Sequence, residues 1–288
     1  MDTTPESLVA SIDRLVSLPE VAVKINNILS QGEYSPASLA EIISHDSDLS
    51  VRLLRLVNSP FYGLPSKIDT IQRAVVVAGA DEIRNLAMAT TVMRSFSGIP
   101  GELANMDLFW RHAVMTGVLA QAISKYCNTL HSDRLFVAGM LHDLGRLVIY
   151  LTQPEKARDI LYITGGDEWI LAETERELLG FSHTDVGAAL FKAWGLSEGL
   201  QSISRYHHLP YLATDYEHDV AIVHIALAIA RGQLSGFSLN EMLWAIDSSA
   251  WYTIGLNANT LNPHLPEMLQ LSEEAIALFT SLGERKTA

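Results

Sequence analysis

Apolar residues recur at helical spacing along the chain, and no segment sustains the alternation of apolar and polar residues that is typical of strands. The clearest case is the segment 133–150, whose regularly spaced apolar residues are Val137, Met140, Leu141, Leu144, Leu147 and Val148. This pattern predicts one buried helix. His142 and Asp143 interrupt its apolar surface, and because buried polar groups need partners, we expect the pair to have hydrogen bonds or a metal ion.

Two glycines flank this pair, Gly139 on the N-terminal side and Gly145 on the C-terminal side. A glycine inside a helix costs about 1 kcal/mol relative to alanine. Its presence on both sides therefore indicates that another helix or a ligand approaches the backbone closely at these positions.

The remaining pattern predicts an all-α protein with two lobes. Residues 1–100 form a predicted N-terminal helical lobe, with helices at 6–16, 19–30, 37–44, 49–57, 70–77 and 82–96. The segment 97–101, with the sequence SGIPG, is the candidate boundary. Residues 101–288 form a predicted second lobe with a C-terminal helical extension; Asp107 can cap a helix at 108–126, and further helices are predicted at 168–179, 183–194, 197–208, 220–231, 240–246 and 266–282.

Composition narrows the function classes. The formal net charge is −13 and the pI about 5.1, without a cluster of Lys and Arg, which argues against non-specific binding of nucleic acid. A single cysteine, Cys127, excludes an intrachain disulfide framework and is compatible with a reducing cytosol. The N-terminus lacks an apolar signal core, and the longest apolar run, 220–230, is interrupted by His224 and too short to span a bilayer. We therefore expect a soluble, cytoplasmic protein that has no membrane contact.

Histidines supply the candidate chemistry. His-Asp dipeptides occur three times, but Asp46 holds a capping position and His218-Asp219 lies in a polar stretch, so these two have a structural interpretation. Five other histidines fall on four different predicted helices of the second lobe, namely His112, His142, His183, His207 and His208. Helical bundles build metal sites by such convergence, and imidazole together with carboxylate suits Fe, Mn, Zn or Ni. The alternative is a set of core or surface histidines with ordinary hydrogen bonds.

Several motifs, in order, resemble those of HDOD proteins, the signalling-associated branch of the HD superfamily. The first lobe carries SLPEVAVKI, LAEIISHDSDLSVRLLRLVNSPFYG and IDTIQRAVVVAGADEIRNLAM, and the second carries FWRHAVMTGVLAQAI, FVAGMLHDLGRLVI, FSHTDVGAALFKAWGL and the pair His207-His208. The resemblance spans residues 15–209 and departs mildly at Ser47 and Ala78, where a proline and a leucine are usual. It implies a helical lobe followed by an HD-type helical bundle in a bacterial signal-transduction protein.

The resemblance also implies a set of metal ligands. His112 resembles the first histidine of the superfamily, His142 and Asp143 its signature pair, and His183, His207 and His208 the extra histidines of HD-GYP phosphodiesterases. The late aspartate ligand is missing, because Leu227 stands at its position. His224 is either a substitute or, in the interpretation we prefer, a buried structural histidine. The HD-GYP signature is also absent from the residues after His208.

Three functions remain open from the sequence. In the first, which we favour, an HDOD-type signal-transduction module with a partly degenerate metal site binds a signalling protein or a small nucleotide-like ligand. In the second, the implied ligands hold Fe, Mn, Ni or Zn for phosphohydrolysis, with Asp143 and Arg146 as candidate catalytic residues. Arg146 either contacts phosphate or pairs with a nearby acid. In the third, the metal or a redox cofactor serves sensing only. The oligomeric state is open.

Overall fold

The structure is a computed structural model that describes residues 3–12, 20–30, 35–59, 62, 66–96, 99–127, 133–244 and 246–283. Every regular element in these ranges is helical, which confirms the predicted all-α class. The first six helices are α1 (Pro5–Ser11), α2 (Glu20–Ser30), α3 (Pro36–Ser44), α4 (Ser47–Val57), α5 (Ile71–Ala78) and α6 (Ala80–Ser95). The others are α7 (Met106–Ser124), α8 (Asp133–Leu141), α9 (Leu144–Thr152), α10 (Pro154–Thr164), α11 (Glu168–Leu179), α12 (His183–Ala193), α13 (Glu198–Tyr206), η1 (Pro210–Leu212), α14 (Glu217–Leu234), α15 (Leu239–Trp244), α16 (Ser248–Ile254), α17 (Ala258–Leu261), η2 (Asn262–His264) and α18 (Leu265–Gly283).

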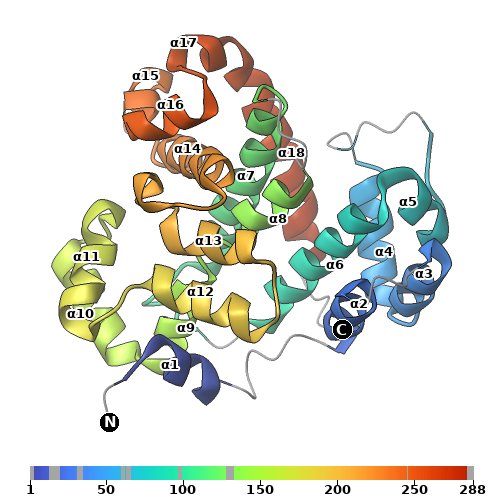
Figure 1. The fold of residues 1–288 in the computed structure, drawn as a ribbon, viewed down its shortest axis with the longest axis horizontal. Coiled ribbons are helices and arrows are strands. Elements are labelled where there is room, and N and C mark those ends of the chain that lie inside the picture. Colours follow the sequence, from blue (N-terminus) through green and yellow to red (C-terminus); the bar gives the residue numbers. More distant parts are fainter. Residues whose placement is uncertain are drawn as a thin grey trace.

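Helices α2–α6 form one group, coloured blue to teal in Figure 1. In this group α3 packs on α5, and α4 packs on α6. Capping residues fix where the helices start. Ser35 caps α3, whose first residue is Pro36, and Asp46 accepts a hydrogen bond from the Leu49 N–H at 2.9 Å to cap α4.

The central helix of the remaining group is α7, which packs against α8, α14 and α18. The backbones of α7 and α8 come very close, because a Cβ added to Gly139 would lie 2.8 Å from the Cα of Gly117. The prediction of a close backbone approach at Gly139 is therefore confirmed. This packing fixes the position of α8, at whose C-terminal end His142 and Asp143 lie.

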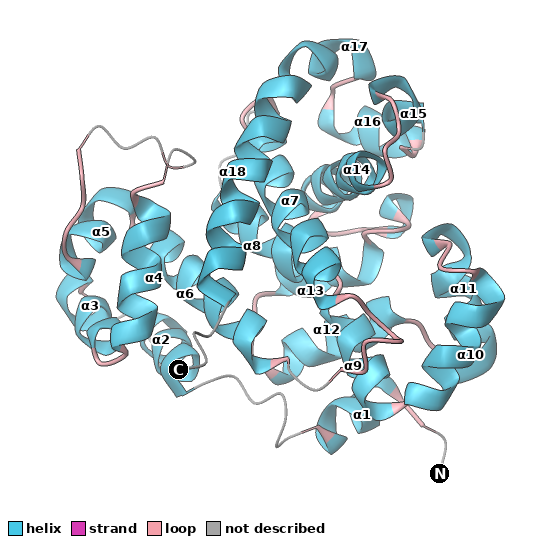
Figure 2. Ribbon diagram, turned by 180° about the vertical axis from the view of Figure 1, so that it is seen from behind, coloured by secondary structure: helices cyan, strands magenta, loops and turns pink. Residues whose placement is uncertain are grey.

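The two groups of helices share one continuous cluster of buried apolar residues. Helix α6 packs against α8, and α18 runs back along α4 and α6 (Figures 1 and 2). Helix α1 packs on α9 and α12, so the start of the chain lies on the C-terminal group. The division near residue 100 stays a prediction, and residues 97 and 98 of the candidate boundary lie outside the described residues.

Some helix bounds differ from the predicted ones. Helix α7 begins at Met106, because Asn105 rather than Asp107 accepts the hydrogen bond from the Leu108 N–H (3.1 Å). The apolar pattern does not predict α10, since Tyr162 is 90% exposed and obscures the buried stripe that Ala157, Ile160 and Thr164 form. Of the predicted helix at 6–16, residues 13–16 lie outside the described residues, as does Pro19.

One helical stretch among the described residues, Arg134–Thr152, is long and apolar enough to cross a membrane, with a mean hydropathy of 1.4 in its most apolar window. Within that window, however, 83% is buried inside the protein, as in the core helix of a soluble protein. The stretch is accordingly a core segment. The cytoplasmic location stays a prediction.

Candidate metal centre

The His142-Asp143 pair lies between two helices rather than within one. Helix α8 ends at Leu141 and α9 begins at Leu144, so the prediction of one uninterrupted helix over 133–150 is wrong at this point. The His142 ring explains the break. Its Nδ1 lies 2.6 Å from the Gly139 carbonyl oxygen, which is the acceptor that a continuous helix would offer to the Asp143 N–H. Asp143 makes no capping hydrogen bond through its side chain, and its carboxylate takes part in the site instead.

Close packing brings α9, α12 and α13 together around this break. A Cβ added to Gly145 would lie 1.9 Å from the His183 carbonyl oxygen, so only glycine lets α9 approach the start of α12. The prediction made for Gly145 is thus confirmed. One turn further along α12, Gly187 lies close to both Gly145 and the Ser204 hydroxyl, which donates a hydrogen bond to the His142 carbonyl oxygen at 3.2 Å.

Four of the predicted ligands form a tight cluster, namely Asp143, His183, His207 and His208. One potential ligand atom from each lies within 4.8 Å of the others. The Nε2 of His183 is 3.1 Å from the Nε2 of His208 and 3.3 Å from the Oδ1 of Asp143. Ligand atoms that share one tetrahedral ion at about 2 Å lie about 3.3 Å apart, so these two separations suit a transition-metal ion.

In three of the imidazoles, Nδ1 lies within hydrogen-bonding distance of an oxygen acceptor of the protein. The Nδ1 of His142 faces the Gly139 carbonyl oxygen, the Nδ1 of His207 lies 2.8 Å from the Ser204 carbonyl oxygen, and the Nδ1 of His183 lies 2.6 Å from a carboxylate oxygen of Glu175. Because carbonyl and carboxylate oxygens only accept, each Nδ1 carries the proton and donates it. In the neutral rings each Nε2 then has a free lone pair, which is the arrangement found in metal-binding histidines.

Two buried polar atoms show whether the residues present suit a metal ion. The Oδ1 of Asp143 and the Nε2 of His207 are buried and have no hydrogen-bond partner among the described residues. Buried polar atoms without a partner are uncommon and call for an explanation. A cation coordinated by both atoms would satisfy them, and the set of one carboxylate and three imidazoles suits Zn, Fe, Mn or Ni.

His142 and His112 lie beside this cluster, outside the set of four. The His142 ring centroid is 4.9 Å from that of His207 and 5.6 Å from that of His112. Burial lowers the pKa of His112 to about 4, against the attraction of nearby Glu168. All six predicted ligands therefore belong to one neighbourhood, although only four of them share a single small space.

Burial and the neighbouring charges favour the protonation states in which Asp143 and most of the histidines can bind a metal ion. Burial opposes ionisation of Asp143, but Arg146 and the surrounding imidazoles hold its pKa well below its usual range. Burial and the neighbouring imidazoles lower the pKa of both His207 and His208 well below the usual value. The pKa of His183 is instead raised, because the attraction of Glu175 and Asp143 outweighs burial. A carboxylate with mostly neutral imidazoles is the form that binds metal.

Arg146, the other candidate catalytic residue, is engaged by acids. Its Nη1 donates to Asp143 Oδ2 at 2.9 Å and to Glu168 Oε1 at 3.0 Å, and its Nη2 donates to the Tyr150 hydroxyl at 3.3 Å. The guanidinium pairs with nearby acids, which is one of the two interpretations open from the sequence. Whether it also contacts phosphate stays a prediction.

Sequence reasoning missed Glu175 and Glu168, which hold His183 and Arg146. A usable signal exists for Glu175, because it shares a helix face with Leu171 and Ala172, and all three are buried. An acid on such an apolar stripe needs a partner.

His224 has a structural role, as expected: its Nδ1 donates to the His207 carbonyl oxygen at 2.7 Å, and its Nε2 accepts from the Asp247 N–H at 3.2 Å.

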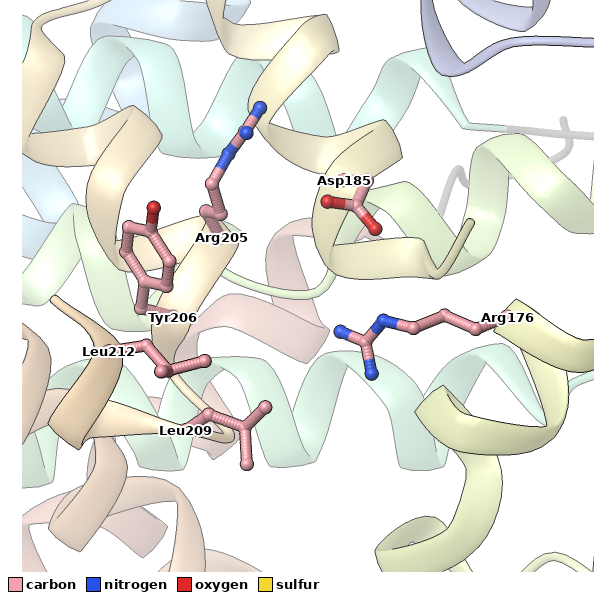
Figure 3. A pocket seen from close by; sticks show the side chains of 6 residues that line it. All are labelled: Arg176, Asp185, Arg205, Tyr206, Leu209 and Leu212. Atoms are coloured by element: carbon pink, nitrogen blue, oxygen red, sulfur yellow. The ribbon is translucent and has the colours of Figure 1, made fainter. Parts of the chain in front are cut away.

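Two cavities of about 430 Å³ each lie in this part of the molecule, and His208 of the cluster lines one of them. The first is lined by Arg176, Asp185, Arg205, Tyr206, Leu209 and Leu212 (Figure 3). The second is lined by Glu168, Ala172, Glu173, Arg176, His208 and Leu209. Figure 3 shows Arg176 extending into the first cavity from the wall opposite Leu209 and Leu212. Because both cavities share Arg176 and Leu209, and the second reaches His208, a ligand in this region would lie beside the cluster.

Comparison with known proteins adds an independent observation. Residues 15–210 match the family model of the HDOD domain. An uncharacterized protein of Treponema pallidum is 26% identical over 223 residues, which make up 76% of this chain and 43% of that protein. The chain thus spans less than half the length of this curated relative.

Solved structures share the helical arrangement. A protein of Shewanella amazonensis proposed to be a phosphohydrolase has a TM-score of 0.77 and 24% identity, covering 94% of this chain and 97% of that one. A protein of Marinobacter aquaeolei proposed to act in signal transduction has a TM-score of 0.73 and 18% identity, covering 99% of this chain and 62% of that one. At such identities the likeness extends to the fold alone, and it agrees with the predicted fold.

Proposed function

The chain belongs to the HDOD domain family, and from this premise we propose that it is a signal-transduction module whose Asp-His cluster binds a divalent transition-metal ion. The observation that carries the proposal is the orientation of His142, His183 and His207. Each ring commits its Nδ1 to an acceptor within the protein. Ordinary core histidines would be expected to pair Nε2 as well, whereas the His207 Nε2 and the Asp143 Oδ1 have no hydrogen-bond partner among the described residues.

A metal ion here would link elements that are far apart in sequence. Asp143 precedes α9, His183 opens α12, and His207 and His208 follow α13. Helix α1 packs on both α9 and α12, so a shift of either helix would also alter the surface that α1 presents. This is a physical route by which a bound ion, or a nucleotide-like ligand beside it, could alter a surface that a signalling protein contacts.

Metal content tests this proposal directly. Elemental analysis of protein purified without chelator is expected to find Fe, Mn, Ni or Zn, and the variant combining His142→Ala with Asp143→Ala is expected to lose it. His45→Ala is the matched control, because His45 also precedes an aspartate but is exposed. Wild-type protein that holds no metal, even after reconstitution, would contradict the proposal.

Phosphoester hydrolysis is a second candidate function, favoured by the cavity that reaches His208. A bound metal ion would supply the chemistry by lowering the pKa of a coordinated water. The residues of the chain would hold the ion, and Arg176 in the cavity could pair with a phosphate oxygen. The Mn-loaded protein should then hydrolyse bis(p-nitrophenyl) phosphate, and His142→Ala should abolish this activity. Activity that survives His142→Ala would come from a contaminant.

A further inference from the structure

The arginines of helices α7 to α18 differ in whether they have acidic partners. Seven arginines lie on these helices, and five of them form an ion pair with an aspartate or a glutamate, namely Arg111, Arg134, Arg146, Arg158 and Arg231. Arg176 and Arg205, which are both exposed, make no ion pair and no side-chain hydrogen bond with any described residue. The two arginines without an acidic partner line the same cavity.

This is the first of the two cavities, and its walls differ in character. Arg176 enters from α11 and Arg205 from α13, while Tyr206, Leu209 and Leu212 lie across from Arg176 (Figure 3). Among the described residues that line the cavity, Asp185 is the single acid. Its Oδ2 already accepts hydrogen bonds from the Ser182 N–H at 3.0 Å and the Ser182 hydroxyl at 3.1 Å. The cavity therefore has two unpaired guanidinium groups against one carboxylate that is engaged in capping α12.

These walls suit a small organic anion. Guanidinium groups recognise phosphate and carboxylate oxygens through paired hydrogen bonds. A phosphate monoester has a charge of about −1.5 to −2 at pH 7, which matches two guanidinium groups better than the single charge of a carboxylate does. The apolar wall of Tyr206, Leu209 and Leu212 offers contact to an aromatic ring attached to the phosphate. The volume of about 430 Å³ lies within the range of about 300–1,000 Å³ that is common for small-molecule sites.

We propose that this cavity binds an aromatic phosphate monoester, such as a mononucleotide, through Arg176 and Arg205 and without contact to the Asp-His cluster. None of the four residues of the cluster lines it. The second cavity does reach His208, but there the acids Glu168 and Glu173 oppose an anion. The phosphate is therefore favoured in the first cavity, where no proposed metal ligand touches it. This inference goes beyond the proposed function, because the site needs no metal ion to bind its ligand.

Equilibrium dialysis with AMP as the probe tests the proposal, on chelator-stripped protein and on protein loaded with Zn²⁺. AMP is expected to bind with the same Kd in both states, and more tightly than inorganic phosphate or adenosine, each of which carries only one half of it. Arg205→Ala should raise the Kd for AMP about 10- to 100-fold, because a hydrogen bond to a charged group is lost. Arg205 is exposed and has no partner among the described residues, so this variant should fold as the wild type does, which circular dichroism verifies.

Arg55→Ala is the matched control for this substitution. Arg55 is an exposed arginine of α4 that has no partner among the described residues, and its loss changes the net charge by the same amount. This variant should bind AMP as the wild type does, and Arg205→Lys, which keeps the charge, should retain part of the affinity.

Four results would overturn the inference. They are equal binding of AMP by the Arg205→Ala and Arg55→Ala variants, no binding of AMP by the wild type, binding of inorganic phosphate as tight as that of AMP, and binding of AMP by the Zn²⁺-loaded protein only. The last result would place the phosphate on the ion. The zinc content of the same samples reports separately on the proposed function, so the two can fail independently.

Discussion

At the scale of single residues, the centre depends on groups that orient the imidazoles. Glu175 is the strongest of these, because its Oε2 lies 2.6 Å from His183 Nδ1 and also accepts the His183 backbone N–H at 2.7 Å. The carboxylate fixes both the position of the ring and the proton on Nδ1. It therefore leaves Nε2 as the atom that faces Asp143 and is available to a metal ion.

Replacing this carboxylate should weaken metal binding without removing a ligand. Residues that orient a ligand commonly contribute about 10- to 100-fold to metal affinity, and we expect Glu175→Gln to lower the affinity by about this factor. Competition with a chromophoric chelator measures the effect. Glu177→Gln, an exposed acid on the same helix, is the control and should bind as the wild type does. Equal affinity in both variants would show that Glu175 has no orienting role.

For single residues, the sequence allowed the candidate ligands to be predicted but not their hydrogen-bond partners. The HDOD resemblance implied that His183, His207 and His208 join Asp143 in one ligand set, whereas spacing along the chain left ordinary core or surface histidines as an alternative. The partners of these groups were not predicted, because an acid such as Glu175 is indistinguishable from a surface acid unless its helix face is considered. Spacing along the chain also does not give distances in space, so it could not predict that His112 lies outside the group of four clustered residues.

At the scale of elements, glycine positions decide how closely α9 and α12 pack. A Cβ on residue 145 would overlap the His183 carbonyl oxygen, and neither backbone can move without disturbing the centre. Overpacking of this kind typically costs about 1–3 kcal/mol. We expect Gly145→Ala to lower the free energy of unfolding by about this amount, as measured by denaturant titration, and to weaken metal binding.

Gly101→Ala is the matched control for this substitution. Nothing lies within 4 Å of a Cβ built at Gly101. Its effect on the free energy of unfolding should stay within about 0.5 kcal/mol, as for most surface changes. Equal stability of the Gly145 and Gly101 variants would mean that the α9–α12 contact relaxes easily.

Helical spacing predicted the existence of most elements and did not predict their interruptions. The apolar run through 133–150 continues across His142 and Asp143, so the break there depends on a hydrogen bond from the His142 ring that apolar spacing does not reveal. Helix α10 was not predicted at all, because the exposed apolar residues Tyr162 and Ile163 obscure its buried stripe. The predicted cap of α7 was also wrong, because Asn105 rather than Asp107 accepts the capping hydrogen bond.

At the scale of the whole molecule, α1 connects the start of the chain to the centre. Leu8 of α1 is only 3% exposed, and the helix packs on α9 and α12. Truncating a buried leucine typically costs about 2–5 kcal/mol, so Leu8→Ala should lower the free energy of unfolding within this range. Val76→Ala, at a site that is 67% exposed, should change it by less than about 0.5 kcal/mol in the same denaturant titration. A small effect of Leu8→Ala would mean that α1 contributes little to the stability of the fold.

The centre should also make the stability of the whole chain depend on metal. Its proposed ligands come from the α8–α9 junction, α12 and the end of α13, so the unfolded chain has no preformed site. An ion that binds only the folded state stabilises it by about 2.7 kcal/mol at a free concentration of 100 times Kd. Adding Zn²⁺ to chelator-stripped protein should therefore raise the Tm, and EDTA should reverse the rise. His45→Ala should keep this response, whereas the variant lacking both His142 and Asp143 should lose it. An equal rise in that double variant would place the stabilising ion elsewhere on the molecule, because the remaining imidazoles would lack the carboxylate that the Asp143 Oδ1 supplies.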